Sequence, residues 1–478
     1  MSSAQEGTPA GPGAGLVPGS ATGNGSATGN GSATRHGSAT GNGSAAAATK
    51  AAAADHATVD AGAADRGTAA DGRAAHGTRR LVGVDAARGA ALLGMIAVHS
   101  LSEADAAGRP TVEYTVVSGR AAALFGVLAG VGVAFLTGRR QVAQSARRAT
   151  VAGLAVRALL ICAFGLVLGQ LDTVMGAVVL TYLGMALLLV IPLVFRPTWQ
   201  VALVGLGAAG LAPAINYYLM SHLPAPRLVN PTVGYLLDEP VGLVIELVFT
   251  GFYPALPWLT YLCAGLVVGR LALTSARVAL ALLGIGAGLA AAASTASTVL
   301  LIRYEGLARI WAAQPASGWT AEETAYLLTF GGDGTVPVAT WWWLALDAPH
   351  TSTPVNLLST TGAALAVLGL LLLAGHATGP LLRRLVSLVR TPLAALGAMT
   401  LTLYVGHVLF LNSDYDTFDA TGGFLVQVGA ALLIGLAWWA TGGRGPLEAL
   451  VSALSGRARR LAGRGSHRRR PSHVIERV

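Results

Sequence analysis

One apolar stretch of the sequence carries an aspartate, an arginine and a histidine at spacings that suit chemistry inside a membrane. This stretch, RLVGVDAARGAALLGMIAVH at residues 80–99, contains Asp85, Arg88 and His99. On a helix, the eleven residues from Arg88 to His99 return to within about 20° of one direction and rise about 16 Å. A polar stripe of this kind is costly in lipid, so we expect it to face a bundle interior or a water-filled cavity.

Structural roles for these three residues remain open from the sequence. Asp85 and Arg88 are also spaced for an i,i+3 ion pair at a membrane interface. His99 alone would suit a hydrogen-bonded histidine at the opposite interface. Taken together, the three residues at this spacing favour a functional site.

Two further histidines fall near the ends of other apolar segments, His350 in DAPHTST and His407 in LYVGH. A neutral imidazole can accept a proton from a hydroxyl or an amine near neutral pH. An arginine nearby, such as Arg120, can stabilise a negative charge that develops on an oxygen during a reaction. Each histidine alone also suits a structural role. The candidate catalytic residues are His99, His350 and His407, and the candidate substrate or donor path contains Asp85, Arg88 and Arg120.

The composition predicts a membrane protein. Of the 478 residues, 53% are hydrophobic and only 12% are charged, whereas soluble domains carry roughly 25% charged residues. Apolar stretches of about 18–25 residues recur, and each can cross a hydrocarbon core of roughly 30 Å as a helix. We therefore predict an all-α polytopic bundle of about ten transmembrane helices. The predicted spans are residues 81–101, 116–137, 151–170, 174–195, 199–220, 253–269, 277–302, 356–375, 392–411 and 421–441.

Charged residues predict the orientation of this bundle. With the N-terminus inside, the connecting segments on the inner side hold most arginines and those on the outer side hold most acids. This distribution follows the positive-inside rule and predicts a multi-pass protein of the plasma membrane with both termini in the cytoplasm. The same rule explains the net charge of +9, so we expect the lipid bilayer, and not nucleic acid, as the partner.

Three regions follow from composition and hydropathy. Residues 1–78 are repetitive and poor in large apolar side chains, which predicts a disordered cytoplasmic tail. Residues 79–445 form the predicted transmembrane domain, and residues 446–478 form a basic cytoplasmic tail. Within the transmembrane domain, residues 241–250 suit either an additional span or a re-entrant or interfacial helix.

The first apolar segment resembles the opening helix of the transmembrane acyltransferase superfamily. That superfamily includes the acyltransferase-3 proteins and the heparan-α-glucosaminide N-acetyltransferase-like family, whose pattern is matched by Asp85, Arg88, Gly89 and His99. Residues 118–140 are similar to the glycine-rich second span of such proteins. PLAALGAMTLTLYVGH at 392–407 and GPLE at 445–448 resemble an uncharacterised bacterial multi-pass family.

This resemblance implies an integral membrane acyltransferase. The implied reaction moves an acyl group, with acetyl as the expected case, from cytoplasmic acyl-CoA (acetyl-CoA) as co-substrate to a sugar or amine of the cell envelope. His99 would be the general base or the acyl carrier. One departure matters: the glucosaminide branch places its catalytic histidine in the loop after the first helix, and residues 102–115 contain no histidine.

Arginines near the predicted cytoplasmic face are candidates for the phosphates of the acyl-CoA donor, because guanidinium forks match phosphate oxygens. The same arginines also suit a role in topology and in contact with anionic lipid. No HxxxH or CxxC spacing occurs, so we expect no metal site. The candidate donor contacts are Arg139, Arg140, Arg147, Arg148 and Arg157.

Two alternatives to an active enzyme stay open. A transporter or flippase of a small solute or lipid-linked molecule also needs polar faces that cross the membrane. Such proteins usually show two related halves, and residues 81–441 contain no convincing internal repeat. The second alternative is a relative that keeps the acyltransferase scaffold and lacks catalysis.

Overall fold

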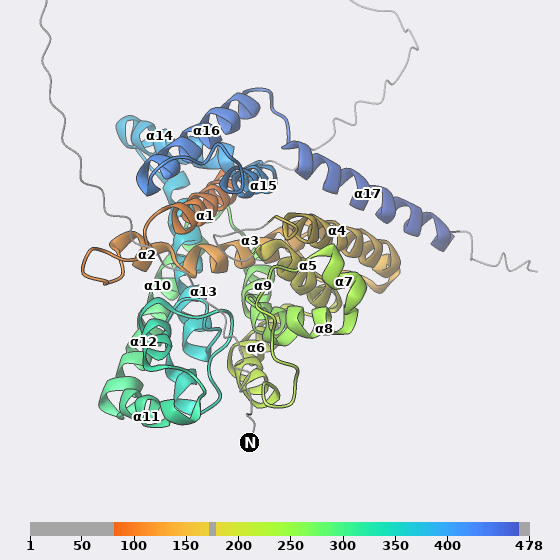
Figure 1. Ribbon diagram of the computed structural model, residues 1–478. Helices are drawn as coiled ribbons and strands as arrows, with labels where there is room; N and C mark the ends of the chain where they lie inside the picture. Colours follow the sequence, from red (N-terminus) through yellow and green to blue (C-terminus); the bar gives the residue numbers. More distant parts are fainter. Residues whose placement is uncertain (1–80, 172–177, 468–478) are drawn as a thin grey trace, which may run out of the picture. The chain divides into compact units, whose positions relative to one another are not determined.

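The computed structural model describes residues 81–171 and 178–467, and these residues form helices and connecting segments without a strand. The all-α prediction is therefore confirmed. The predicted disordered tail at 1–78, the start of the predicted span at 174–195 and the last residues of the predicted C-terminal tail, 468–478, lie outside the described residues. Figure 1 shows the helices with the labels used below.

Seven helical segments of the described residues are long and apolar enough to cross a membrane, and two bent pairs raise the total to nine. The α8–α9 pair bends by 56° and the α14–α15 pair by 78°. One shorter apolar segment, α5 with the following 3-10 turn, covers Val179–Phe195. Each of the ten predicted spans therefore has a helical counterpart. The seven are α1 (Val82–Ser100), α2 with α3 (Val112–Leu136), α4 with its preceding turn (Gln144–Leu168), α6 (Thr198–Leu219), α10 with a π-turn (Ala276–Arg303), α13 with a 3-10 turn (Pro354–His376) and α16 (Ala420–Ala440).

The remaining helices belong to the bent pairs, to two long connections (residues 220–254 between α6 and α9, and residues 304–353 before α13) and to the C-terminal segment. The first bent pair consists of α8 with its π-helical turn and α9, and the second consists of α14 and α15. The first long connection contains α7 and α8, and the second contains α11 and α12. Their bounds are α7 (Val233–Asp238), α8 (Pro240–Ile245), α9 (Ala255–Gly269), α11 (Gly306–Ala313), α12 (Ala321–Phe330), α14 (Pro380–Gly397), α15 (Thr400–Leu411) and α17 (Pro446–His467).

Glycines let the helices that carry the candidate site approach each other closely. A Cβ on Gly89 of α1 would lie 1.9 Å from the Leu393 carbonyl oxygen of α14. A Cβ on Gly265 of α9 would lie 1.9 Å from the Val127 carbonyl oxygen of α3. Small residues at helix contacts are typical of membrane bundles, where close backbone approach provides the packing energy. These contacts fix α1 and α3 against their neighbours.

The prediction of one continuous span at 392–411 is wrong, because the chain breaks between α14 and α15. Gly397 ends α14 against α1, where a Cβ would lie only 1.7 Å from the Asp85 carbonyl oxygen. The new helix α15 begins at Thr400, and its first amides bind a carboxylate from Glu448. A tertiary contact and a cap supplied by another helix thus divide a continuous apolar sequence.

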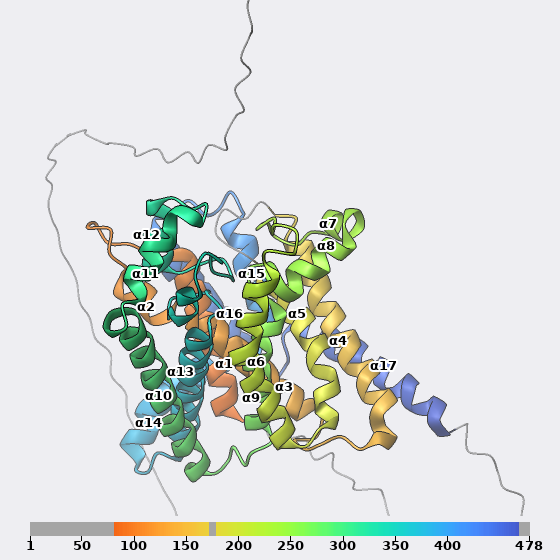
Figure 2. The ribbon, with the colours of Figure 1, turned by 90° about the horizontal axis from the view of Figure 1, so that it is seen from below.

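The stretch 241–250 lies in α8 and a π-helical turn, Glu246–Thr250, which together form one arm of the bent pair with α9. This arrangement is a broken span or a re-entrant loop. Figure 2 shows α7 and α8 at the same end of the long helices as α11 and α12. The two long connections therefore lie on one side of the bundle, as the charge pattern predicts.

The predicted basic tail begins as a helix. Within residues 446–467, α17 packs along α4, and a Cβ on Gly153 would lie 3.2 Å from the Cβ of Arg459. The Arg459 guanidinium also donates a 3.1 Å hydrogen bond to the Leu136 carbonyl at the end of α3. These contacts make α17 part of the folded domain and place Glu448 beside α15.

Candidate functional site

The N-terminal end of α1, here called the arginine end, carries an ion pair and opens to a cavity. Arg88 donates a 3.0 Å hydrogen bond to Asp85, and both side chains are largely shielded from solvent. The guanidinium extends across α3, where a Cβ on Gly132 would lie 3.6 Å from Nη2. Arg88, Arg157 and Glu448 line a cavity of about 200 Å³. The interfacial ion pair and the cavity-lining role suggested by the sequence therefore occur together.

Glu448 belongs to this cavity and also organises its wall. Its carboxylate accepts hydrogen bonds from the amides of Leu401 and Thr402, at 2.6 and 3.2 Å, and from the Thr402 hydroxyl at 2.6 Å. A carboxylate at a helix N-terminus satisfies unpaired amides and interacts favourably with the helix dipole. The C-terminal helix α17 thus fixes the start of α15 at the cavity.

Most of the cavity wall is apolar. Apolar and aromatic residues make up most of the lining beside the charged groups, among them Phe125, Leu128, Ile161, Leu183, Leu187, Trp258 and Tyr404. A cavity that combines charged groups with mostly apolar walls suits a ligand that has both a charged part and an apolar part.

The other four arginines predicted to contact the donor lie away from this cavity. The Arg139 guanidinium binds the backbone carbonyls of Gly269 and Leu271 and lies over the Phe135 ring. Arg147 lies over the Phe195 ring, and Arg140 and Arg148 are exposed. Of the five candidate donor arginines, Arg157 is the one that reaches the cavity.

The C-terminal end of α1, here called the histidine end, contains a chain of hydrogen bonds between neutral polar side chains. His99 Nδ1 lies 2.9 Å from His407 Nε2, and the two rings are parallel. His407 Nδ1 contacts Gln427 Oε1 on α16, and Gln427 Nε2 donates a 3.0 Å hydrogen bond back to Ser100 Oγ. His407 is 5% exposed, whereas His99 is half-buried. Of the two residues, His99 is therefore the more exposed.

The histidine end lies directly beyond the cavity. Tyr404 lines the cavity, and His407 follows it by three residues on α15. Residues three apart share one helix face, so the end of the cavity and the histidine pair lie one helical turn apart. His99 and His407 themselves do not line the cavity.

His350 lies in a strained loop at the same end. His350 and Ser352 have φ values of 57° and 50°, a left-handed region that is rarely occupied by residues other than glycine. The neighbouring side chains of Thr351 and Thr353 are buried, and the His350 carbonyl accepts a 2.8 Å bond from the Gly334 amide. Strain of this kind persists where the surrounding structure imposes it, often near functional sites.

The surroundings of His350 connect it to the rest of the site. Its ring meets Tyr253 edge to face at 5.5 Å, and it lies within electrostatic range of His99. Burial lowers the pKa of His350 to about 4 from an ordinary 6.5. The imidazole is therefore neutral near pH 7 and can accept a proton or a hydrogen bond.

Asp347 holds the His350 loop in place. Its carboxylate accepts hydrogen bonds from Ser294 of α10 at 2.6 Å and from Asn356 of α13 at 3.3 Å. Its own amide donates to Ser297 Oγ at 3.0 Å. The loop is thus anchored between two packed helices, and this anchoring supports its left-handed residues.

Arg120 begins α3 directly after Gly119, and its guanidinium donates to the Thr115 carbonyl of α2. Gly119 itself packs on the His350 loop, where an added Cβ would lie 3.6 Å from the His350 amide nitrogen. Arg120 therefore belongs to the neighbourhood of His350, and its hydrogen bond stabilises the turn between α2 and α3.

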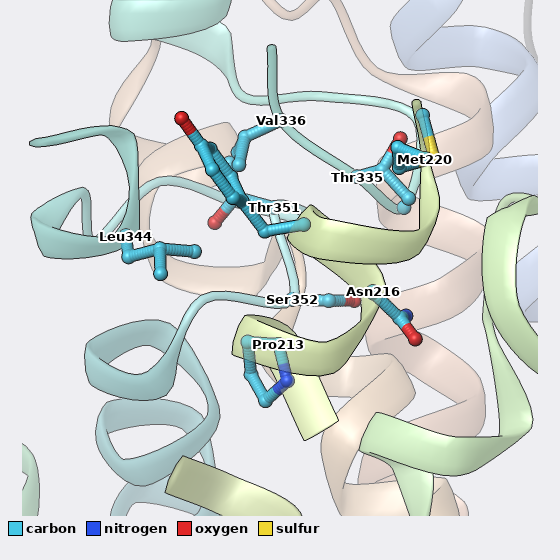
Figure 3. Close-up of a pocket in the computed structure, with 10 residues that line it drawn as sticks. Pro213, Asn216, Met220, Thr335, Val336, Leu344, Thr351 and Ser352 are labelled. Atoms are coloured by element: carbon cyan, nitrogen blue, oxygen red, sulfur yellow. The ribbon is translucent and has the colours of Figure 1, made fainter. Parts of the chain in front are cut away.

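A second, small cavity lies beside this loop (Figure 3). Its volume is about 20 Å³, which is close to the space of one water molecule. Thr351 and Ser352 line it together with Asn216 of α6. The Asn216 amide donates a 2.8 Å hydrogen bond to the Phe249 carbonyl. This cavity is too small for a substrate.

The sequence alone did not identify Gln427 or Glu448 as members of the site. Gln427 was recognisable in principle, since a lone amide within an apolar span usually has a specific partner. Glu448 falls in the GPLE motif, but its contact with α15 depends on the path of α17. Among the residues that the structure describes, no group of three or more His, Cys, Asp or Glu side chains is placed to hold a metal ion.

A comparison with known families finds a match over part of the chain. Residues 80–303 match the family model described as heparan-alpha-glucosaminide N-acetyltransferase, catalytic. The matched segment contains Asp85, Arg88, His99 and Arg157, whereas His350, His407, Gln427 and Glu448 follow it. No curated protein matches the chain.

Proposed function

We propose that this membrane protein is an acyl-CoA-dependent acyltransferase, with acetyl-CoA as its donor. The proposal starts from residues 80–303, which match the family model of the heparan-alpha-glucosaminide N-acetyltransferase catalytic domain. The acceptor is a sugar or an amine of the cell envelope. The observation that carries the proposal is the cavity between Arg88 and Tyr404, with the His99–His407 pair one turn beyond it.

The charged end of the cavity supports a role in donor binding. Arg88 and Arg157 present guanidinium groups at the cavity, and arginine binds phosphate oxygens strongly through paired N–H groups. The phosphates of the donor would remain at this end, which we place on the cytoplasmic side. The apolar walls would surround the arm that carries the thioester toward Tyr404.

The histidine end supplies a base for acyl transfer. His99 would accept the proton of the acceptor O–H or N–H as that oxygen or nitrogen attacks the thioester carbonyl. The C–S bond then breaks, and the CoA thiolate takes the proton from the His99 imidazolium. The products are the acylated acceptor and CoA thiol. General base catalysis by a positioned histidine contributes about 10² to 10⁴ in rate.

The direct test uses purified protein in lipid vesicles, acetyl-CoA labelled in the acetyl group and an extract of envelope glycans and amines. We expect label on an acceptor with the wild-type protein and loss of transfer with His99→Ala. His222→Ala is the matched control, since His222 is exposed on α6's C-terminal turn and binds only its neighbours Ser221 and Tyr218 in the described structure. Absence of transfer by the wild-type protein to any component of the extract would contradict the proposal.

A transporter is the second candidate, because two bent helix pairs occur in the described residues. Broken helices are common at the substrate sites of secondary transporters. The same vesicles distinguish the two functions. Movement of solutes from the extract across the vesicle wall, unchanged by His99→Ala and without acyl transfer, would favour transport.

A further inference from the structure

The hydrogen-bond chain at the histidine end has a direction, and Gln427 sets it. The Gln427 carbonyl oxygen Oε1 faces His407 Nδ1, and its amide nitrogen Nε2 donates to Ser100 Oγ at 3.0 Å. A carbonyl oxygen accepts hydrogen bonds and cannot donate them. The proton of neutral His407 must therefore lie on Nδ1, and its Nε2 carries a lone pair.

The same argument fixes the proton on His99. His407 Nε2 lies 2.9 Å from His99 Nδ1, so the lone pair of His407 requires a proton on His99 Nδ1. In a neutral imidazole one nitrogen is protonated and the other is not. His99 Nε2 is consequently unprotonated, and His99 is the more exposed residue of the pair.

We infer that Gln427 is a positioning residue for the proposed acyl transfer. Through His407, it holds His99 in the tautomer whose Nε2 can accept the proton of the acceptor. The inference rests on the proposed function for its chemical purpose, but the tautomers themselves follow from the hydrogen bonds. When His99 accepts the proton at Nε2, its Nδ1–H remains bonded to His407, which stabilises the imidazolium without moving a second proton. A wrong tautomer at a catalytic histidine can cost up to about 10⁴ in kcat.

The placement of the three residues suits this role. They come from different helices, His99 from α1, His407 from α15 and Gln427 from α16. Both His407 and Gln427 are buried, at 5% and 7% exposed. Buried polar side chains that satisfy one another hold a single arrangement, because water cannot replace the lost bonds.

The first experiment reads the tautomers without any reaction. The full chain, labelled with ¹⁵N in the histidine rings, is studied in lipid bilayers by solid-state NMR. The signals of the pair are assigned from their loss in His99→Asn and His407→Asn. We expect both rings to be protonated at Nδ1 and not at Nε2. Protonation of His99 at Nε2 in the wild-type protein would overturn the inference.

Substitutions at Gln427 extend this test. Gln427→Leu removes the acceptor, so we expect His407 and His99 to show mixed tautomers. Gln427→Glu, studied at a pH at which the new carboxyl is ionised, keeps an oxygen that only accepts, so we expect the wild-type tautomers. Gln141→Leu is the matched control, since that amide donates to the Phe195 carbonyl away from the histidines. Unchanged tautomers in Gln427→Leu would overturn the inference, and size-exclusion and melting profiles confirm that each variant is folded.

The kinetic readout separates positioning from a merely structural role. In Gln427→Leu we expect kcat to fall by about 10- to 100-fold while KM for acetyl-CoA changes by less than about twofold. Gln427→Glu should restore kcat to within about threefold of the wild type. An unchanged kcat in folded Gln427→Leu would overturn the positioning role. If the tautomers match the expectation and no acyl transfer occurs in any variant, the proposed function fails and the proton arrangement stands.

Discussion

The two ends of α1 carry different kinds of polar chemistry within one helix. At the arginine end the groups are ionic: Arg88 pairs with Asp85, and Glu448 caps α15 beside a cavity of about 200 Å³. At the histidine end the groups are neutral amides, hydroxyls and imidazoles joined in a chain. The difference indicates a division of labour, because fixed charges bind a charged ligand and a neutral chain controls where a proton lies.

The division is also visible in what surrounds each end. The arginine end opens to the apolar cavity, so a ligand has room there. The histidine end is packed against α15 and α16, whose His407 and Gln427 are buried, and neither His99 nor His407 lines the large cavity. A substitution at the arginine end should therefore act mainly on binding, and one at the histidine end mainly on chemistry or on protonation.

The largest effect in binding is expected for Arg88→Gln. A hydrogen bond to a charged group contributes about 1.5–3 kcal/mol, so KM for acetyl-CoA should rise by roughly 10- to 100-fold with kcat changed far less. Arg148→Gln is the matched control, since Arg148 is exposed. Initial rates across a range of acetyl-CoA concentrations measure both constants. A fall in kcat with constant KM would show that Arg88 does not act through donor binding.

A somewhat smaller effect is expected when the cavity is filled. Ala129 lines the cavity on α3, and Ala129→Trp would occupy much of its volume. We expect KM for acetyl-CoA to rise by about tenfold, equivalent to about 1.4 kcal/mol, while the melting temperature stays close to that of the wild type. Ala129→Ser, which adds little volume, is the control. Wild-type kinetics in a folded Ala129→Trp protein would place the donor elsewhere.

These expectations depend on features that the sequence predicted unevenly. Hydropathy predicted the all-α class and the helical segments, because each span must satisfy its own backbone in lipid. It could not predict the break at Gly397, where the apolar pattern continues and the cause is contact with the backbone of Asp85. Continuity of composition is therefore weak evidence for continuity of a helix.

The candidate site shows the same limit. Helical periodicity predicted that Arg88 and His99 share a face, and hydropathy placed His350 and His407 near the ends of other apolar segments. The hydrogen bond between His99 and His407 depends on how α15 packs against α1, which no local pattern encodes. Gln427 offered a signal as an amide in an apolar span, whereas the contact of Glu448 with α15 required the position of α17.

A moderate effect on stability is expected for Glu448→Ala, which tests whether α17 organises the arginine end. Loss of a helix cap typically costs about 0.5–2 kcal/mol, so the melting temperature in detergent should fall by a few degrees. Glu448→Gln retains an acceptor for the Leu401 amide and should recover part of the loss. Equal stability of all three proteins would show that the contact between Glu448 and α15 does not stabilise the fold.

The smallest effect is expected at His350, and it depends on pH. Burial lowers its folded pKa to about 4 from an ordinary 6.5, so between these values the unfolded chain binds a proton that the folded protein excludes. The contribution of this neutral histidine to stability is therefore complete above about pH 6.5 and falls as the pH is lowered toward 4. We expect the melting temperature of the wild type to decline over this window and that of His350→Asn to decline less. His376→Asn is the control, because His376 is an exposed histidine at the end of α13. If the melting temperatures of the wild type and His350→Asn change with pH in parallel, His350 is protonated alike in the folded and unfolded chains. The neutral character of the histidine end would then not extend to the His350 loop.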